Sequence, residues 1–584
     1  MRRPILLSAA LFVLGGAVSA RAQAPATELE FRRHVAQLVQ SGRLTYDEGL
    51  LVRFQRVFAP EDLPPGLRGS AAVPARSATG LVMEYRSIRD GLPAHIVRQI
   101  DRYLGGSAAQ GAFAHETAHF RLAYDLTGPH AVDPADANAN GAPDYVERIG
   151  GWAETAWARL FDDAGFTRPS PASGKIPISF REMQALGYTV LDGGEPRIVL
   201  HRDYAGFPEN RDPEGSANGA AKVSAAHELK HVSQWEASGW SEGGWLEADA
   251  TWAEDFVFDA TDDYLRELPH GSPVSHPDAW IAGGASYEDC LWQHLLAQRW
   301  GTAVLVDFFA RRSERSGESV LASFEHALGR RGGDLASAAR ELAVWSYFCG
   351  GNAFGRPAGF EEAAAYPTPP FGHSLAGPSE TVSAALSGFG THYVFVSAEQ
   401  RHGKPFVSFS SDRSAPFAVH AMTLAPGGAR AVHVVPVGAP DAVPVEIPVE
   451  WSELPFLVVA VTNSGAAGRD DDYFLSVDDD HAVDASLPVS GFPFALEASR
   501  PNPFRDVTEI SFSLPSDGPV RLAVYDVGGR LVQRLAEGQR LPAGRHGRTW
   551  DGKDQSGRFA APGVYYYRLE AGELFATRSL LLLR

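Results

Sequence analysis

The apolar pattern of the chain changes from helical spacing to alternation near Pro367. Before this proline many apolar residues recur at the spacing of an amphipathic helix, whereas apolar and polar residues alternate through most of 381–478. Alternation interrupted by Gly, Pro and Asp is typical of a β-sandwich. A chain of 584 residues also has room for roughly three to five domains. We therefore expect a multidomain protein with an α+β part followed by all-β modules.

The part before Pro367 is expected to contain two segments. Apolar residues at helical spacing, such as Leu29 and Val35, predict a helical N-terminal segment over 25–112. This segment is a candidate pro-region. Short strand-like runs followed by a series of helical patterns predict an α+β domain over 113–370.

Residues 1–24 have the organisation of a secretory signal peptide. Two arginines precede an apolar stretch from Ile5 to Val18, and small residues at Ala20 or Ala24 suit a cleavage site. No later run reaches the roughly 18 apolar residues that a membrane-spanning helix needs. We therefore expect an exported protein, secreted or on the cell surface, with no permanent membrane span. An uncleaved N-terminal anchor is the alternative.

Charge and cysteine content exclude several classes of protein. The formal net charge is -19 at pH 7, which disfavours a nucleic acid or an anionic membrane as partner. The chain has only 2 Cys, so it is not a disulfide-dense scaffold. Cys290 and Cys349 both lie in predicted helices. They either form a disulfide or remain two buried thiols.

The pentapeptide His-Glu-x-x-His occurs twice, at 115–119 and at 227–231. On a helix, residues four apart lie on one face, so both imidazoles reach one metal ion while the glutamate faces the metal-activated water. The first copy runs into alternating Phe120, Leu122 and Tyr124, which predict a strand. Two histidines four apart on a strand are separated by about 13 Å, too far to share one zinc ion. The second copy lies in a helical pattern and is the predicted site.

A third ligand for zinc follows the second copy. Catalytic zinc commonly has three protein ligands and one open position, and His227 and His231 supply two of them. Glu247 lies at the start of the next predicted helix, and the glycines before it allow the chain to fold back. Glu254 lies seven residues further, nearly on the same helical face, and is a candidate to orient a ligand imidazole. Its rivals in that role are Asp249 and Asp255.

This arrangement resembles a known enzyme family. His-Glu-x-x-His followed by Trp-Leu-Glu and by a second Glu seven positions on resembles the gluzincin metallopeptidases, whose third zinc ligand is that first Glu. With the segments 119–122 and 140–147, the region from about 30 to 370 resembles a largely inferred family of secreted bacterial metalloproteases. The resemblance implies a zincin-like metallopeptidase domain over 113–370. Gln234 stands where the metzincin pattern needs glycine, which excludes that subclass.

The expected function is that of a secreted zinc-dependent endopeptidase, acting on a protein or peptide substrate. Glu228 is the predicted general base that takes a proton from metal-activated water. Related enzymes add a Tyr or His donor to the oxyanion, and Tyr287 and His294, seven apart on one predicted helix, are candidates. Each is alternatively a packed aromatic or a surface histidine. A non-catalytic exported adhesion or binding protein with structural metal sites is the second hypothesis.

The strand predicted over 197–201 is a candidate edge strand. An exposed edge offers unpaired backbone groups that an extended peptide substrate can pair with. The sequence gives no further information on substrate preference.

A twelve-residue loop over 136–147 has the spacing of a calcium site. Gly141 stands at position 6, where such loops turn sharply. The loop's oxygen donors come from Asp136, Asn138, Asn140, the carbonyl of Ala142, Asp144 and Glu147. The alternative is an Asn/Gly-rich turn that caps the helix expected from Tyr145.

The last part of the chain is predicted to consist of a linker, 479–495, and a β module, 496–584. The module contains five characteristic segments: Asn502-Pro503-Phe504, Arg521 to Val527, Ala543-Gly544-Arg545, Thr549-Trp550-Asp551-Gly552 and Gly563 to Arg568. They resemble the C-terminal immunoglobulin-like modules related to FlgD and to type IX secretion sorting domains. The resemblance implies delivery by a bacterial export or sorting machinery. A generic sandwich without a sorting role is the alternative.

Overall fold

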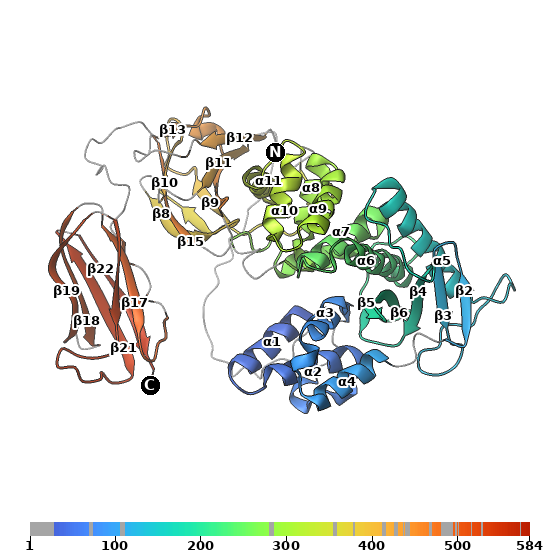
Figure 1. The fold of residues 1–584 in the computed structure, drawn as a ribbon. Helices are drawn as coiled ribbons and strands as arrows, with labels where there is room; N and C mark the ends of the chain where they lie inside the picture. Colours follow the sequence, from blue (N-terminus) through green and yellow to red (C-terminus); the bar gives the residue numbers. More distant parts are fainter. Residues whose placement is uncertain are drawn as a thin grey trace, which may run out of the picture. The chain divides into compact units, whose positions relative to one another are not determined.

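The computed structural model describes most of the chain from residue 28 onward (Figure 1). The predicted signal peptide, 1–24, and most of the predicted linker, 479–495, lie outside the described residues. The described residues are 28–68, 74–105, 111–278, 285–353, 359–377, 380–411, 416–424, 430–435, 437, 444–465, 470–479, 495–496, 499, 501–514, 517–526, 530–542, 544–572 and 574–583.

The chain divides into two compact units. The first comprises Met1–Arg159, Pro169–Val232 and Val257–Asp263, and the second comprises Leu160–Arg168, Ser233–Phe256 and Tyr264–Arg584. The boundary between Val232 and Ser233 falls inside helix α6 (Ser216–Ser238), so that this helix contributes to both units.

The first unit begins with helices where the sequence predicts them. These are α1 (Glu28–Gln40), α2 (Tyr46–Phe58), α3 (Thr79–Ile88) and α4 (Ala94–Gly105). Thr45 and Glu48 form a capping box at the start of α2, in which each side chain bonds the backbone N–H of the other residue.

A six-stranded sheet follows in the order β1-β5-β6-β4-β3-β2. Strands β3, β4 and β6 are parallel, β5 is antiparallel to β6, and β1 is parallel to β5. The strand bounds are β1 (Ala75–Ser77), β2 (Phe113–Glu116), β3 (Phe120–Tyr124), β4 (Ile176–Arg181), β5 (Ala185–Asp192) and β6 (Glu195–His201).

One strand of the sheet comes from before residue 112, the expected boundary between the N-terminal segment and the α+β domain. Strand β1 belongs to the N-terminal segment, yet it pairs with β5 of the same sheet, with Ser77 opposite Gly187. Apolar side chains of α2, α3 and α4 share one core with those of β5 and β6. Helical spacing marks the helices but gives no sign of a three-residue strand, which is too short to show alternation.

The remaining helices come mostly after the sheet, as expected for an α+β arrangement. Their bounds are α5 (Asp144–Trp157), α7 (Trp245–Val257), α8 (Leu291–Trp300), α9 (Ala303–Glu314), α10 (Val320–Gly329) and α11 (Leu335–Tyr347), with α6 already given. Helix α5 lies between β3 and β4 in the sequence.

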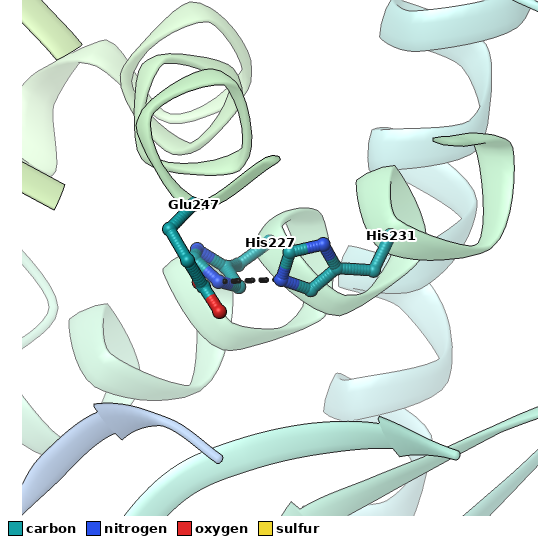
Figure 2. A group of neighbouring side chains, drawn as sticks. All are labelled: His227, His231 and Glu247. Carbon is teal, nitrogen blue, oxygen red and sulfur yellow. Dashed lines mark hydrogen bonds between the residues drawn. The ribbon is translucent and has the colours of Figure 1, made fainter. Parts of the chain in front are cut away.

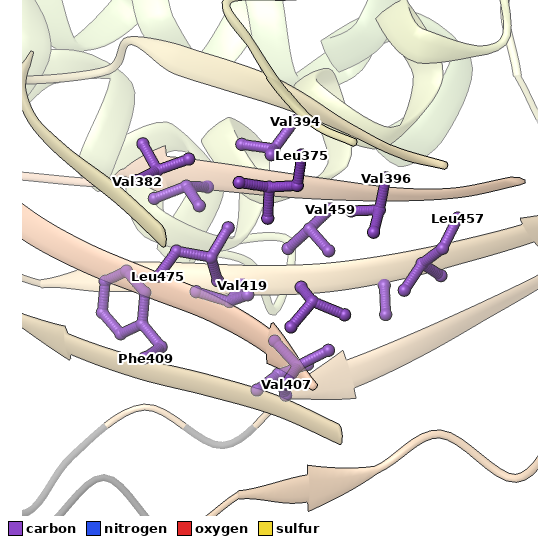
Figure 3. Close-up of a cluster of buried hydrophobic side chains, with 14 of the residues drawn as sticks. Leu375, Val382, Val394, Val396, Val407, Phe409, Val419, Leu457, Val459 and Leu475 are labelled. Atoms are coloured by element: carbon purple, nitrogen blue, oxygen red, sulfur yellow. The ribbon is translucent and has the colours of Figure 1, made fainter. Parts of the chain in front are cut away.

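A β-sandwich follows in the second unit. One sheet has the order β13-β10-β15-β8 and the other β12-β11-β14-β9-β7. Their inward-facing apolar side chains form a single core, part of which Figure 3 shows. Strand β7 pairs with β9, so the sandwich begins at His373, before the predicted start at 381. The strands are β7 (His373–Leu375), β8 (Thr381–Ser387), β9 (Thr391–Ser397), β10 (Phe406–Ser411), β11 (Phe417–Leu424), β12 (Arg430–Val435), β13 (Val445–Glu446), β14 (Phe456–Asn463) and β15 (Asp470–Asp478).

The last module is a second two-sheet sandwich, with the orders β16-β17-β20 and β19-β18-β21-β22. Its core includes the fully buried side chains of Trp550 and Tyr567. The strands are β16 (Ala495–Leu496), β17 (Thr508–Leu514), β18 (Gly518–Asp526), β19 (Leu531–Leu541), β20 (Gly544–Trp550), β21 (Gly563–Ala571) and β22 (Leu574–Leu582).

Within the described part of the chain, no helix has both the length and the apolar character that crossing a membrane requires.

Candidate metal centre

Helix α6 carries the second His-Glu-x-x-His copy. It runs for 23 residues, and its spacing of four places His227 and His231 on the same face. Their Nε2 atoms face each other at 3.1 Å (Figure 2). Both histidines are buried.

Glu247 joins the two histidines from the first turn of α7. One ligand atom from each of His227, His231 and Glu247 lies within 4.8 Å of the other two (Figure 2). The three residue types are those that hold zinc in gluzincins, and all three side chains are buried. The structure thus brings together the three predicted ligands.

The donor set fits zinc on size as well as on chemistry. Two imidazole nitrogens, each at zinc–nitrogen bonding distance in a tetrahedral site, are roughly 3.3 Å apart. The observed separation of 3.1 Å between the two Nε2 atoms is close to that value. Two neutral imidazoles and one carboxylate leave a bound Zn²⁺ with net positive charge, which is the condition for activating water.

Glycines allow the chain to turn between α6 and α7. Helix α6 ends at Ser238, and Gly239 follows with φ of 64°, the left-handed conformation that glycine adopts without strain. Gly244 precedes α7 and has no space for a side chain, because a Cβ there would lie 1.8 Å from the carbonyl oxygen of Ala285. The backbone conformation at Gly239 and the lack of space at Gly244 thus agree with the prediction that glycines let the chain fold back between α6 and α7.

Glu228 is held by two threonine hydroxyls. Its Oε2 accepts hydrogen bonds from the hydroxyls of Thr79, at 2.9 Å, and Thr189, at 2.7 Å. The Glu228 side chain also lies against Gly187, where a Cβ would come within 3.0 Å of Glu228 Cγ. Neither threonine is marked by a sequence motif. Thr79 lies 149 positions from Glu228, and no motif links the two.

Glu254 lies on α7 and is buried, as are its rival Asp249 and, in part, Asp255. Asp249 accepts a hydrogen bond of 2.8 Å from Gln234. Asp255 Oδ2 lies 3.8 Å from Nδ1 of His294. Orientation of a ligand imidazole by Glu254 stays a prediction, with Asp249 and Asp255 as its rivals.

Tyr287 and His294 do not lie on one α-helix, which corrects the prediction. Tyr287 begins the 3₁₀ turn η8 (Tyr287–Cys290), and His294 lies in α8, which starts at Leu291. Since 3₁₀ and α geometries differ in residues per turn, a spacing of seven does not place the two side chains on one face. The ring of His294 stacks on Tyr264, with centroids 4.8 Å apart. Burial lowers the pKa of His294 to about 3.

The first His-Glu-x-x-His copy is not helical. His115 and Glu116 lie at the end of β2, and the chain turns at Ala118 and His119 before β3. His119 stacks on Trp157, with ring centroids 4.0 Å apart, and its Nδ1 lies 2.6 Å from Oε2 of Glu154. Burial raises the pKa of Glu154, but hydrogen bonds from Thr117 and His119 outweigh it and lower the pKa.

The predicted calcium loop turns back on itself before α5. Glu147 accepts hydrogen bonds from the side-chain amides of Asn138, at 2.9 Å, and Asn140, at 2.5 Å. Asp136 accepts from the backbone N–H of Asn140 and Gly141. N–H groups of the loop itself thus donate hydrogen bonds to the carboxylate oxygens that would bind calcium. Ala142 and Asp144 lie at the end of the loop, where α5 starts, and calcium binding stays a prediction.

Strand β6 is not an edge strand, contrary to the expectation for 197–201. It pairs with β4 on one side and with β5 on the other. Its backbone groups are therefore committed within the sheet and cannot align a peptide. A strand-like run does not reveal its neighbours, because pairing depends on the topology of distant segments.

Cys290 and Cys349 are buried, and they form no disulfide with each other. Of the two alternatives left open by the sequence, the structure has the two buried thiols. Cys290 ends the 3₁₀ turn η8, and Cys349 follows α11 with its Sγ donating to the carbonyl of Trp345.

Comparison with known proteins identifies the last module. The family model described as "FlgD Ig-like domain" matches residues 502–573. This part of the chain is an FlgD Ig-like domain. Its two-sheet β structure agrees with that assignment. No curated protein matches the chain.

Solved structures give further similarities. FlgD from P. aeruginosa is 34% identical over 13% of this chain and 58% of its own, with a TM-score of 0.11. PorZ, described as an essential bacterial surface component of the type-IX secretion system of Porphyromonas gingivalis, is 15% identical over 19% of this chain and 14% of its own, with a TM-score of 0.13. A β-1,2-glucanase from Parabacteroides distasonis is 15% identical over 35% of this chain and 33% of its own, with a TM-score of 0.14. The chain thus spans less than two thirds of each of these proteins.

Proposed function

We propose that this chain is an exported zinc-dependent endopeptidase of gluzincin type. The observation that carries the proposal is the convergence of His227, His231 and Glu247 within 4.8 Å, with Glu228 between the two histidines in the sequence. This is the full set of residue types that a gluzincin site uses. It is supported by the 3.1 Å separation of the two Nε2 atoms, which suits one shared ion.

The roles of the residues follow from their chemistry. His227, His231 and Glu247 would hold the zinc ion. Bound zinc supplies a Lewis acid that lowers the pKa of water and polarises a carbonyl group. Glu228 takes the proton from the attacking water and later delivers it to the leaving amine nitrogen. Its carboxylate is already oriented by Thr79 and Thr189.

Burial of the site favours a second candidate function. His231 is 0% exposed and Glu247 is 8% exposed. A closed site is typical of structural zinc, whereas catalytic zinc keeps an open position. The alternative is therefore an exported adhesion or binding protein in which the metal joins α6 to α7.

One substitution separates the two candidates. The Glu228→Gln variant removes the proton acceptor and leaves all three ligands in place. If the chain is a peptidase, the wild type cleaves casein and E228Q loses nearly all activity while zinc content, measured by elemental analysis, is unchanged. Equal cleavage by the wild type and E228Q would contradict the mechanism, and a zinc-loaded wild type without activity would favour the structural role.

Glu116 offers a matched control. It occupies the same position in the first His-Glu-x-x-His copy, where it contacts Lys175 on the surface. The Glu116→Gln variant should keep full activity. If only E228Q is inactive, the loss of activity is due to Glu228 itself and not to replacing any glutamate of a His-Glu-x-x-His pentapeptide.

We also propose that the FlgD Ig-like domain directs delivery of the protein by a bacterial export or sorting machinery to the cell surface or the medium. Support comes from the motif segments of 496–584 and from the family match over 502–573. Deleting 496–584 should retain the protein inside the cell, as followed by immunoblotting of cell and medium fractions. Unchanged release of the deleted form would contradict the proposal.

A further inference from the structure

Two threonine hydroxyls from different elements hold the carboxylate of Glu228. Thr79 starts helix α3, and Thr189 lies on strand β5. Both donate to the same oxygen, Oε2, over 2.9 Å and 2.7 Å. Thr79 and Thr189 are 0% exposed and Glu228 is 1% exposed, so water does not replace these hydrogen bonds. Hydrogen bonds from neutral donors to a buried carboxylate are among the stronger ones in proteins.

A third hydrogen bond fixes the direction of the Thr79 proton. The backbone N–H of Thr189 donates to Oγ1 of Thr79 over 2.7 Å. Since that oxygen accepts a proton from Thr189, its own proton is directed at Glu228. The three groups thus form one chain, from the N–H of Thr189 through the hydroxyl of Thr79 to Oε2 of Glu228.

Strand topology explains why Thr79 is in this position. Strand β1 ends at Ser77, so it offers no further backbone acceptor to β5. Ala78 still donates its N–H to the carbonyl of Gly187, and the hydroxyl of Thr79 then accepts from Thr189. The side chain of Thr79 thereby takes the place of a strand carbonyl and connects the sheet edge to Glu228.

The opposite side of the carboxylate faces a glycine. A Cβ at Gly187 would lie 3.2 Å from Oε1 of Glu228 and 3.0 Å from Cγ. Neither threonine hydroxyl bonds Oε1. The two oxygens of Glu228 are therefore in different surroundings.

The segment that supplies Thr79 is built into the first unit. Arg76 forms a buried ion pair with Asp263, with Nη1 and Oδ2 3.0 Å apart and side-chain exposures of 2% and 1%. Val82 and Tyr85 of α3 pack in one core with Tyr188 and other residues of β5 and β6. Removing the segment would expose this core and leave a buried charge without its partner, and both changes are costly.

We propose that Thr79 and Thr189 are the positioning residues of Glu228, and that residues 28–105 are a permanent part of the catalytic unit. This inference rests on the proposed peptidase function and replaces the interpretation of 25–112 as a removable pro-region. The threonines do not touch substrate. They hold Oε2 so that Oε1 is presented to the water proton in one orientation.

The test compares Thr79→Val, which keeps the shape and removes the hydroxyl, with Thr79→Ser, which keeps the hydroxyl. T79V should lower kcat about 10- to 100-fold with little change in KM, because the substrate is bound as before. T79S should recover most of the activity. Thr189→Val should act in the same direction. Zinc content should stay at the wild-type level in every variant, since no ligand is altered.

Thr155→Val provides the control. Thr155 lies on the surface of α5, in the same unit, and its hydroxyl donates to the carbonyl of Gly151. This variant should keep wild-type kcat. A T79V protein as active as T155V would overturn the positioning role, and a T79V protein more active than the wild type would identify Thr79 as an inhibitory contact instead.

N-terminal sequencing of the secreted wild-type protein tests the same inference without any variant. The mature chain should begin close to residue 25, and the active species should retain Thr79. An active species that begins after residue 79 would overturn the inference. Because E228Q reports on the peptidase function itself, an inactive E228Q together with a fully active T79V would refute only the role of Thr79.

Discussion

The side-chain amide of Gln234 on α6 donates a hydrogen bond of 2.8 Å to the carboxylate of Asp249 on α7. The same nitrogen lies 3.1 Å from the carbonyl oxygen of Leu246. Gln234 follows His231 by three positions, and Leu246 directly precedes Glu247. One amide therefore connects the helix that carries the histidines to the turn of helix that carries the carboxylate.

Replacing Gln234 with Leu should weaken zinc binding without removing a ligand. The substitution removes a donor from buried Asp249 and frees the start of α7 to move relative to α6. Residues that orient metal ligands typically contribute about 10- to 100-fold in affinity, and we expect a loss in that range. Competition with a chromophoric chelator measures it. Gln37→Leu, on the surface of α1, is the control, and equal affinity of the two variants would contradict the role of Gln234.

Glu247 should be required for tight zinc binding. Glu247→Ala leaves only the two imidazoles and removes the negative charge that offsets part of the charge on Zn²⁺. Elemental analysis after dialysis should find zinc in the wild type and little in E247A. Glu236→Ala removes an exposed glutamate from α6 and should keep the wild-type content. A wild-type zinc content in E247A would show that Glu247 is not a ligand.

Calcium should stabilise the first unit through the loop 136–147. At about ten times its Kd, a ligand that binds only the folded state adds about 1.4 kcal/mol to the free energy of unfolding. Glu147→Gln removes the expected bidentate ligand, so calcium should no longer raise the melting temperature. Glu209→Gln, an exposed residue outside the loop, should respond like the wild type. If calcium does not stabilise the wild type, the loop is the Asn/Gly-rich cap that the sequence offers as the alternative.

The β-sandwich should lose stability below pH 6.5 because of His392. Burial, with a smaller contribution from His373, lowers the pKa of His392 to about 4, and its ring bonds the hydroxyl of Tyr473 over 2.8 Å. Between pH 6.5 and 4 the unfolded chain binds a proton that the folded sandwich does not, so stability falls as the pH falls. At pH 4.5 the expected loss relative to pH 7.5 is about 2.5 kcal/mol.

Urea unfolding followed by hydrogen exchange in β9 and β14 measures this change. His392→Gln should flatten the dependence on pH, whereas His402→Gln, which alters an exposed histidine, should not. Equal pH dependence in the two variants would show that other groups destabilise the sandwich in acid.

The sequence was sufficient where the decisive pattern is local. The spacing of four in 227–231 and the glycines before Glu247 need only one helix and one turn, and the structure has both. The alternating strands of the sandwich, and the module matched by the FlgD Ig-like family, could be predicted from the sequence for the same reason. Side-chain period and turn residues are properties of short windows of sequence.

Features that depend on the pairing of distant segments could not be predicted from the sequence. Thr79 comes next to Glu228 only because β1 pairs in parallel with β5. The sequence of β6 does not distinguish an edge strand from a central strand, because that depends on its pairing with β4 and β5. The supposed helix of Tyr287 and His294 is interrupted because η8 ends before α8 begins, a change of geometry that a spacing of seven does not reveal.

The contact at Gly244 has a consequence for engineering. A methyl group at this position would collide with the carbonyl of Ala285, about forty residues downstream, so the turn before Glu247 depends on a distant piece of backbone. Any substitution at Gly244 would therefore displace either this turn or the backbone at Ala285. A redesign of the metal centre thus has to keep glycine at this position.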